Sequence, residues 1–214
     1  MQRSAVVLPR LYPILDVTFF PSTADLVSFA KVLVESGCSL LQYRNKSGNA
    51  RVMLEHAREL RRVFSKDDSH NDSVRLIMND RADLCLAAEF DGVHVGQDDL
   101  SPEAVRSIIG LDRWLGVSTH NPEQLREADL SSSDYLAIGP VFPTSSKQNP
   151  DPVVGLEGLR RARDLTRKPL VAIGGITRGN AASVIDAGAD SVAVISDLVR
   201  EPRRSAEEFF RILG

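Results

Sequence analysis

The chain has 214 residues, of which 43% are hydrophobic and 26% are charged, and its formal net charge is −3 at pH 7. This composition is ordinary for a globular protein, and the weakly negative charge argues against a nucleic-acid surface, which would normally be basic. No apolar run approaches the roughly 18 residues that span a bilayer, so we expect no membrane segment.

Residues 1–10 read as an N-terminal extension, because their apolar stretch is too short for a secretory signal and a transit peptide is normally longer and richer in Ser and Arg. The two cysteines, Cys38 and Cys85, lie in apolar segments and outside any metal-ligand spacing. This pattern indicates buried, reduced thiols and favours a cytoplasmic protein.

Short apolar runs rich in β-branched residues predict eight strands along the chain. In chain order they are Leu11–Leu15, Leu40–Tyr43, Arg75–Met78, Gly92–Val95, Trp114–Val117, Tyr135–Ile138, Leu170–Ile173 and Ser191–Ile195. Helical spacing of apolar residues predicts helices between them, at Ala24–Ser36, Val52–Phe64, Arg81–Ala88, Ser101–Ile109, Pro122–Ala128, Leu156–Leu165, Asn180–Ala187 and Ser205–Leu213. The hydrophilic stretch Ser65–Ser73 reads as a flexible, acidic surface loop.

Strands that are apolar throughout are covered on both faces, and their alternation with helices indicates parallel strands joined by crossovers. Eight such units in a chain of this length predict a single TIM-barrel domain, a (β/α)8 fold of class α/β, over residues 1–214. The alternative is an open doubly wound sheet, which would usually carry a GxGxxG turn after its first strand, and residues 11–23 have none.

Functional groups of such a barrel gather on the loops that follow the strands. After the second strand, alternation puts Gln42, Arg44 and Lys46 on one side. A glutamine and two cations on an inward face need polar partners, and the bidentate fork of arginine with the point charge of lysine suits a multiply charged anion such as pyrophosphate.

The third strand is followed by Asn79 and Asp80, and the fourth by a loop that contains Asp99. Either aspartate could cap the helix that follows it. As a pair beside Arg44 and Lys46, they favour a Mg²⁺ site, because proteins usually hold this cation with one or two carboxylates and substrate phosphates.

The fifth strand is followed by Ser118, which could donate to a substrate, and by His120, which could be a general base or a packed or capping histidine. Residues 139–147 follow the sixth strand and carry Thr144, Ser146 and Lys147. Hydroxyls, exposed amides and a lysine can surround phosphate oxygens, although the stretch alone could be a proline-rich turn.

The last two strands are followed by Gly174-Gly175 and by Ser196. Barrels often hold a phosphate between these loops, and glycine lets the backbone approach an anion closely. The loops that follow the strands, which we call the strand tips, therefore predict two anion-binding centres. One is cationic and metal-assisted, and the other is a neutral cradle of amides and hydroxyls. Together they suggest transfer of a group from a diphosphate to a phosphorylated acceptor.

These tips closely resemble the thiamine-phosphate synthase family. The matching pieces are residues 42–46, 79–80, 92–99, 116–120, 139–144, 146–147, 174–176 and 194–196, in family order. The resemblance implies a TIM-barrel transferase that joins hydroxymethylpyrimidine diphosphate to hydroxyethylthiazole phosphate and releases pyrophosphate. It also implies a dissociative mechanism, in which pyrophosphate leaves and the thiazole nitrogen captures a pyrimidine methylene cation.

By this resemblance, Arg44, Lys46, Asn79 and Lys147 hold the diphosphate, and Asp80 and Asp99 bind Mg²⁺. Gln42 and Ser118 face the pyrimidine. The thiazole phosphate would be contacted by Thr144, Ser146, Gly175, Ile195 and Ser196. Arg44, Lys46, Ser118 and Lys147 would be the catalytic residues. Partners would be these small-molecule substrates, with no nucleic acid or membrane, and a homo-oligomer is compatible with the sequence because small barrels often pair.

Two alternatives remain. A thiazole tautomerase-like relative would keep Gly175 and Ser196 and could use His120 as a proton carrier, but it would not need Lys46, Asp99 and Lys147 together. A non-catalytic barrel that binds a phosphate ligand would show no steady release of pyrophosphate when both substrates are supplied.

Overall fold

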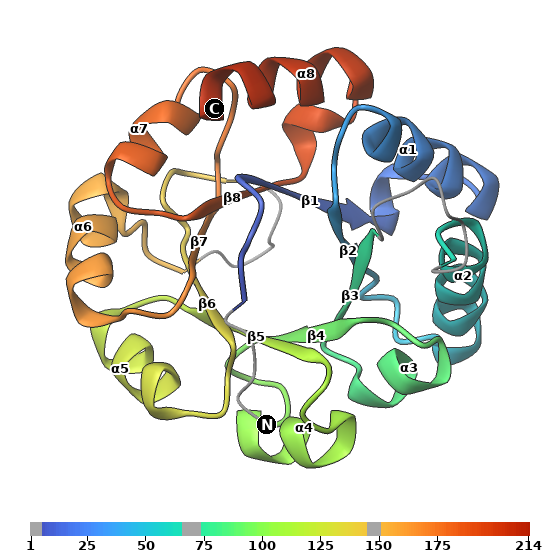
Figure 1. The fold of residues 1–214 in the computed structure, drawn as a ribbon, viewed down its shortest axis with the longest axis horizontal. Coiled ribbons are helices and arrows are strands. Elements are labelled where there is room, and N and C mark those ends of the chain that lie inside the picture. The colour runs from blue at the N-terminus through green and yellow to red at the C-terminus, as the bar shows by residue number, and fades with distance from the viewer. Residues whose placement is uncertain (1–5, 66–73, 145–150) are drawn as a thin grey trace.

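A computed structural model describes residues 6–65, 74–144 and 151–214. Over these residues, parallel strands pair in chain order and close into a barrel, and helices surround it (Figure 1). The strands are β1 (Leu11–Asp16), β2 (Leu40–Arg44), β3 (Arg75–Asn79), β4 (Gly92–Val95), β5 (Trp114–Thr119), β6 (Tyr135–Ile138), β7 (Leu170–Ile173) and β8 (Ser191–Val194). The predicted fold class is confirmed.

The helices follow the strands in strict alternation. They are α1 (Thr23–Glu35), α2 (Ala50–Val63), α3 (Ala82–Ala87), α4 (Pro102–Ile109), α5 (Pro122–Leu130), α6 (Gly155–Leu165), α7 (Ala181–Asp186) and α8 (Pro202–Leu213), with 3-10 turns η1 (Val17–Phe19) and η2 (Ser196–Leu198). Polar caps start several of them, since the side chains of Ser22, Asn49, Ser101 and Asn121 accept hydrogen bonds from backbone amides of the first turn. No described helix is long and apolar enough to cross a membrane.

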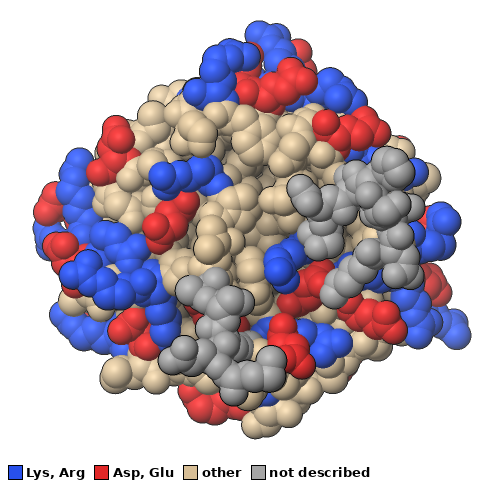
Figure 2. All heavy atoms as spheres, viewed as in Figure 1, with Lys and Arg blue, Asp and Glu red and all other residues tan. Residues whose placement is uncertain are grey.

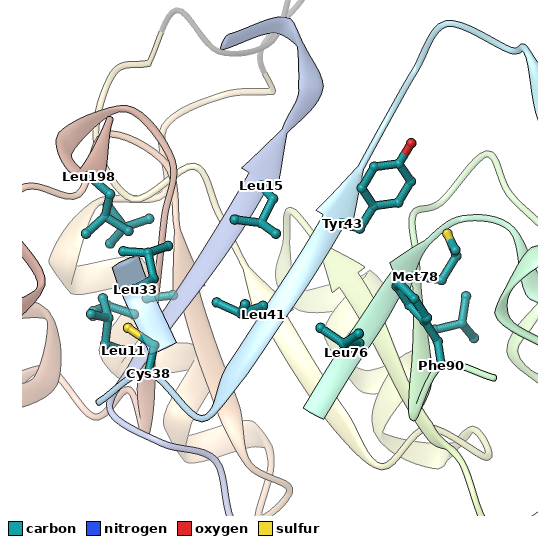
Figure 3. Close-up of a cluster of buried hydrophobic side chains, with 14 of the residues drawn as sticks. Leu11, Leu15, Leu33, Cys38, Leu41, Tyr43, Leu76, Met78, Phe90 and Leu198 are labelled. Atoms are coloured by element: carbon teal, nitrogen blue, oxygen red, sulfur yellow. The ribbon is translucent and has the colours of Figure 1, made fainter. Parts of the chain in front are cut away.

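Alternation along each strand separates two buried layers. One set of side chains packs between the sheet and the helices, and Figure 3 shows its members on the first three strands, Leu11, Leu15, Leu41, Tyr43, Leu76 and Met78. The other set fills the barrel interior, with Tyr12, Ile14, Leu40, Ile77 and Tyr135. Cys38 and Cys85 are free, buried thiols, as predicted.

The chain segment before β1 closes one end of the barrel. In Figure 1 this dark blue segment crosses the middle of the ring of strands, and Leu8 is buried among the interior side chains. Figure 2 shows the same face, where acidic and basic side chains are interspersed around the rim. Leu8 therefore fills the end of the barrel at which the strands begin.

Several strands extend beyond the apolar runs that predict them. β1, β2, β3 and β5 continue by one or two polar residues, because those residues still pair with their neighbours, as Asp16 does with Arg44 and Asn79 with His94. β8 ends at Val194, one residue earlier than predicted. The helices agree with prediction to within about three residues. Residues 66–73, most of the predicted hydrophilic loop, lie outside the described residues.

Candidate active site

A cavity of about 450 Å³ opens where the strands finish. Every strand contributes to it, from Tyr12 of β1 to Val194 of β8. The predicted site residues that the structure describes all line this cavity: Gln42, Arg44, Lys46, Asn79, Asp80, Asp99, Ser118, Thr144, Gly175, Ile195 and Ser196. Ser146 and Lys147 lie outside the described residues, so their roles stay predictions.

Arg44 stands at the end of β2 and is held by Asp16 from the end of β1. The two residues are in register across the strand pair, and the Arg44 guanidinium donates to the Asp16 carboxylate. Asp16 is buried, and its second oxygen accepts hydrogen bonds from the amide and hydroxyl of Thr18 at 3.0 and 2.7 Å. Sequence reasoning missed Asp16, although the strand-tip rule, applied to the first strand, would have found it.

Lys46, Asp80 and Asp99 form a charged group at the ends of β2, β3 and β4. Lys46 Nζ donates to Asp80 Oδ2 at 2.5 Å, and the Gly96 amide donates to Asp99 Oδ2 at 2.7 Å. Burial raises the pKa of Asp80, and the nearby Asp99 carboxylate raises it further, while Lys46 opposes both effects. The Asp99 carboxylate is therefore close enough to disfavour the charge on Asp80.

Neither aspartate caps a helix. Ser101 caps α4, and the cap residue of α3 is Arg81, which makes no side-chain cap bond. Asp80 instead adopts a left-handed backbone conformation, with φ of 64°, and its amide donates to the His94 carbonyl at 2.8 Å. A positive φ is uncommon for residues other than glycine, and the bond to His94 helps to hold Asp80 in this conformation.

Asn79 lies beside this charged group with an amide that has no internal partner. The side chain is buried and lines the cavity, and its Nδ2 makes no hydrogen bond within the described residues. An unmade bond of this kind costs free energy that a ligand oxygen in the cavity would recover.

The floor of the cavity is a row of hydrogen-bonded side chains from five strands. Gln42 Nε2 donates to the Tyr12 hydroxyl at 3.0 Å, and the Tyr12 and Tyr135 hydroxyls are 3.0 Å apart. Tyr135 Oη lies 3.1 Å from His94 Nδ1, and His94 Nε2 lies 2.8 Å from Ser118 Oγ. We call these five residues the floor relay.

The floor relay is uncharged at neutral pH. Burial lowers the pKa of His94 to about 4 and raises the pKa values of Tyr12 and Tyr135. Of its members, sequence reasoning singled out only Gln42 and Ser118, because the two tyrosines read as core residues of apolar strands.

His120 lines the cavity next to the loop that follows β6. Its Nδ1 donates to the Gly139 carbonyl at 2.6 Å, and its backbone amide donates to Gln124 Oε1 at 2.8 Å. Its Nε2 lies 3.5 Å from an Asp151 oxygen. Since Gly139 is the first residue after β6, the hydrogen bond from His120 Nδ1 holds the start of this loop in place.

The loops after β7 and β8 form the uncharged side of the cavity. Gly174 and Gly175 have φ of 97° and 64°, and a Cβ at position 175 would lie 2.5 Å from the Pro143 carbonyl oxygen. Only glycine fits this turn, because it is both left-handed and crowded. Asn180 Nδ2 donates to the Gly175 carbonyl at 3.0 Å and fixes the turn from behind.

Arg178 joins these two loops. Its backbone amide and its Nε donate to Asp197 Oδ2 at 2.9 and 3.0 Å, and its Nη1 donates to Glu208 of α8 at 2.6 Å. Asp197 follows Ser196 in η2, so these bonds hold Ser196 beside the glycine turn. The cavity therefore has one side lined by cations and carboxylates and another side formed by fixed backbone.

Comparisons with known proteins show what the chain as a whole is similar to. A family model described as thiamine monophosphate synthase matches residues 11–198. The chain is 61% identical to a thiamine-phosphate synthase from Koribacter versatilis over 98% of both chains, and 42% identical to one from Chloroflexus aurantiacus over 89% of this chain and 85% of the relative. The structure of a thiamine phosphate pyrophosphorylase from Pyrococcus furiosus superposes with a TM-score of 0.82 at 33% identity, covering 95% of each chain.

Proposed function

The chain belongs to the thiamine monophosphate synthase family, and we propose that it makes thiamine phosphate from hydroxymethylpyrimidine diphosphate and hydroxyethylthiazole phosphate, with release of pyrophosphate. It is a transferase of a pyrimidinylmethyl group. The observation that carries the proposal is the division of one cavity into a charged side and an uncharged side. This division matches two substrates that carry anions of different size and fate.

The charged side would bind the diphosphate that leaves. Arg44, Lys46 and Asn79 offer guanidinium, ammonium and amide donors, and Lys147 is proposed to add a second ammonium group. As the carbon–oxygen bond breaks, negative charge builds up on the leaving oxygen, and fixed donors stabilise that charge. Asp16 contributes by holding the Arg44 guanidinium before substrate arrives.

Asp80 and Asp99 fit a Mg²⁺ ion. Within the described residues no group of three or more His, Cys, Asp or Glu side chains gathers as a metal cluster, so the remaining ligands would be diphosphate oxygens and water. The raised pKa of Asp80 supports this assignment, because a divalent cation would relieve the unfavourable pairing of the two carboxylates. When bound, the ion supplies positive charge to the leaving pyrophosphate.

The pyrimidine would lie on the floor of the cavity, against Gln42 and Ser118. Its amino group supplies the electrons that expel pyrophosphate, and the thiazole nitrogen then forms the new carbon–nitrogen bond. This chemistry requires no protein nucleophile. The residues instead bind and orient the two substrates, and alignment can contribute up to about 7–11 kcal/mol.

The uncharged side would hold the phosphate of the thiazole. Backbone amides at Gly175 and Ile195 and the hydroxyls of Thr144, Ser146 and Ser196 are proposed to bind it. No cation of this loop pair is needed, because the acceptor phosphate anchors the substrate and takes no part in bond breaking. We propose these small molecules as the partners of a cytoplasmic enzyme.

A coupled assay tests the proposal. Purified protein is supplied with both substrates and Mg²⁺, and pyrophosphate and thiamine phosphate are measured together. Equal, steady formation of both products is expected. Pyrophosphate release that does not depend on the thiazole phosphate, or binding without turnover, would contradict the proposed function.

A further inference from the structure

We propose that the hydrogen bonds of the floor relay all donate in one direction, from Gln42 toward Ser118. This direction makes Ser118 a hydrogen-bond donor toward the pyrimidine diphosphate. Tyr12, Tyr135 and His94 are then positioning residues, since they act through Ser118. The identity of the acceptor rests on the proposed function, whereas the direction of the relay does not.

The direction begins at Gln42. Its Nε2 can only donate, so the hydroxyl of Tyr12 accepts this bond. Among the residues that the structure describes, the buried Tyr12 hydroxyl has one other partner, Tyr135. A buried hydroxyl proton without an acceptor is unfavourable, so Tyr12 donates to Tyr135.

The direction continues through His94. Tyr135 Oη already accepts from Tyr12, so its own proton goes to His94 Nδ1, 3.1 Å away. A neutral imidazole with an accepting Nδ1 carries its proton on Nε2. That proton is donated to Ser118 Oγ at 2.8 Å.

Ser118 is the last member, and its hydroxyl proton remains available to the cavity that it lines. The backbone carbonyl of Ser118 accepts from Gln97 Nε2 at 2.6 Å, which holds the residue in place. In the opposite direction, the Ser118 proton would be used in the bond to His94. The direction therefore decides whether Ser118 can donate to a substrate.

Gly116 on β5 provides the space for the relay. A Cβ at this position would lie 2.2 Å from Tyr135 Cζ and 2.3 Å from His94 Nδ1. Any larger residue would displace the bond between these two side chains. The contact is thus built into the packing of β4, β5 and β6.

The direction is tested by the tautomer of His94 in the full-length protein. Two-bond ¹H–¹⁵N correlation spectra distinguish a proton on Nε2 from one on Nδ1, and the His94→Gln variant identifies the His94 signals among those of the four histidines. The expected result at neutral pH is the Nε2–H form. An Nδ1–H form or a doubly protonated ring would overturn the proposal.

The link to Ser118 is tested by a double-mutant cycle. Tyr135→Phe is expected to lower kcat about tenfold, which is the size of effect that loss of one hydrogen bond in the transition state would have. The KM for thiazole phosphate is expected to stay unchanged. The same change in a Ser118→Ala background is expected to have little further effect. Independent losses that multiply in the double variant would overturn the link.

Tyr43→Phe is the matched control. It also removes a buried tyrosine hydroxyl, but that hydroxyl contacts His56 Nδ1 at 3.0 Å and accepts from Asn45 Nδ2 at 3.1 Å, outside the relay. The His94 tautomer is expected to stay unchanged, and a change in it would overturn the specificity of the relay. If the wild-type protein made no thiamine phosphate, the proposed function would fail, while the tautomer would still decide the direction.

Discussion

The charged side of the cavity holds its groups by ion pairs between side chains, whereas the uncharged side is shaped by backbone. Arg44 and Lys46 are paired with Asp16 and Asp80, so the diphosphate proposed to bind there would share or exchange these partners. At Gly175, by contrast, the turn is fixed by its own φ, by close packing and by Asn180. The comparison indicates an adjustable site for the group that leaves and a preformed site for the group that stays.

The largest effect is expected for Arg44→Ala. Loss of a charge-assisted donor to the leaving group should lower kcat/KM for the pyrimidine diphosphate by about 10³-fold. The KM for thiazole phosphate should stay the same, because that substrate is proposed to bind on the other side. Steady-state kinetics with each substrate varied in turn measure both quantities.

Arg126→Ala is the control for Arg44→Ala, since Arg126 is an exposed arginine of α5 that contacts only Glu123 in the described ion pairs. It should leave both constants unchanged. If Arg44→Ala mainly raised the KM for thiazole phosphate, the division of the cavity into two sides would be wrong.

A smaller loss, about 10²-fold in turnover at ordinary Mg²⁺, is expected for Asp99→Ala, because one carboxylate ligand of the proposed ion is removed. Turnover should recover in part at high Mg²⁺. Titration of the rate with Mg²⁺ checks this, with Asp83→Ala, an exposed carboxylate of α3, as the control. An unchanged Mg²⁺ dependence would remove Asp99 from the metal site.

His94, in the floor between the two sides, should make folding stability depend on pH. Burial lowers its folded pKa to about 4, so an unfolded chain, with a histidine pKa near its usual 6.5, binds the proton first as the pH falls. Stability is therefore lost as the pH falls below about 6.5, by about 2 kcal/mol at pH 5. Urea unfolding at pH 7 and pH 5 measures this loss.

The variant His94→Gln isolates that contribution. The pKa of His56 is also lowered by burial, which adds to the loss of stability as the pH falls. The raised pKa of Asp80 has the opposite effect on stability. The change of wild-type stability with pH is therefore the sum of these contributions. The variant should show a smaller decrease between pH 7 and pH 5. An equal decrease in both proteins would mean that His94 is not held neutral.

The smallest effect is expected for Gly175→Ala, about a tenfold rise in the KM for thiazole phosphate, because a methyl group would force the turn away from the phosphate. Gly110→Ala is the matched control, since Gly110 has φ of 73° but no atom within 4 Å of the added Cβ. The control should lose some thermal stability and keep its KM. A similar KM in both variants would contradict a preformed cradle.

Much of the fold was predictable, because a local pattern encodes it. β4, β6 and β7 have the bounds that their apolar runs predict. The polar tips were predictable as well, since a charged residue such as Arg44 cannot end a buried strand without a partner.

The sequence did not reveal the partners that only barrel closure brings together. Tyr12 and Tyr135 are separated by 123 positions and look like core residues, yet their hydroxyls meet in the floor relay. Asp16 pairs with Arg44 only because β1 and β2 are in register. Pairing between distant strands depends on the register of the whole sheet, which no short motif carries.

A crystal structure with Mg²⁺, pyrophosphate and thiazole phosphate bound together tests the division of the cavity most directly. Pyrophosphate is expected against Arg44 and Lys46, with the metal between it and the carboxylates of Asp80 and Asp99. The thiazole phosphate is expected on the amides near Gly175 and Ser196. Pyrophosphate bound at Gly175 and Ser196, or a metal bound away from both aspartates, would contradict this division.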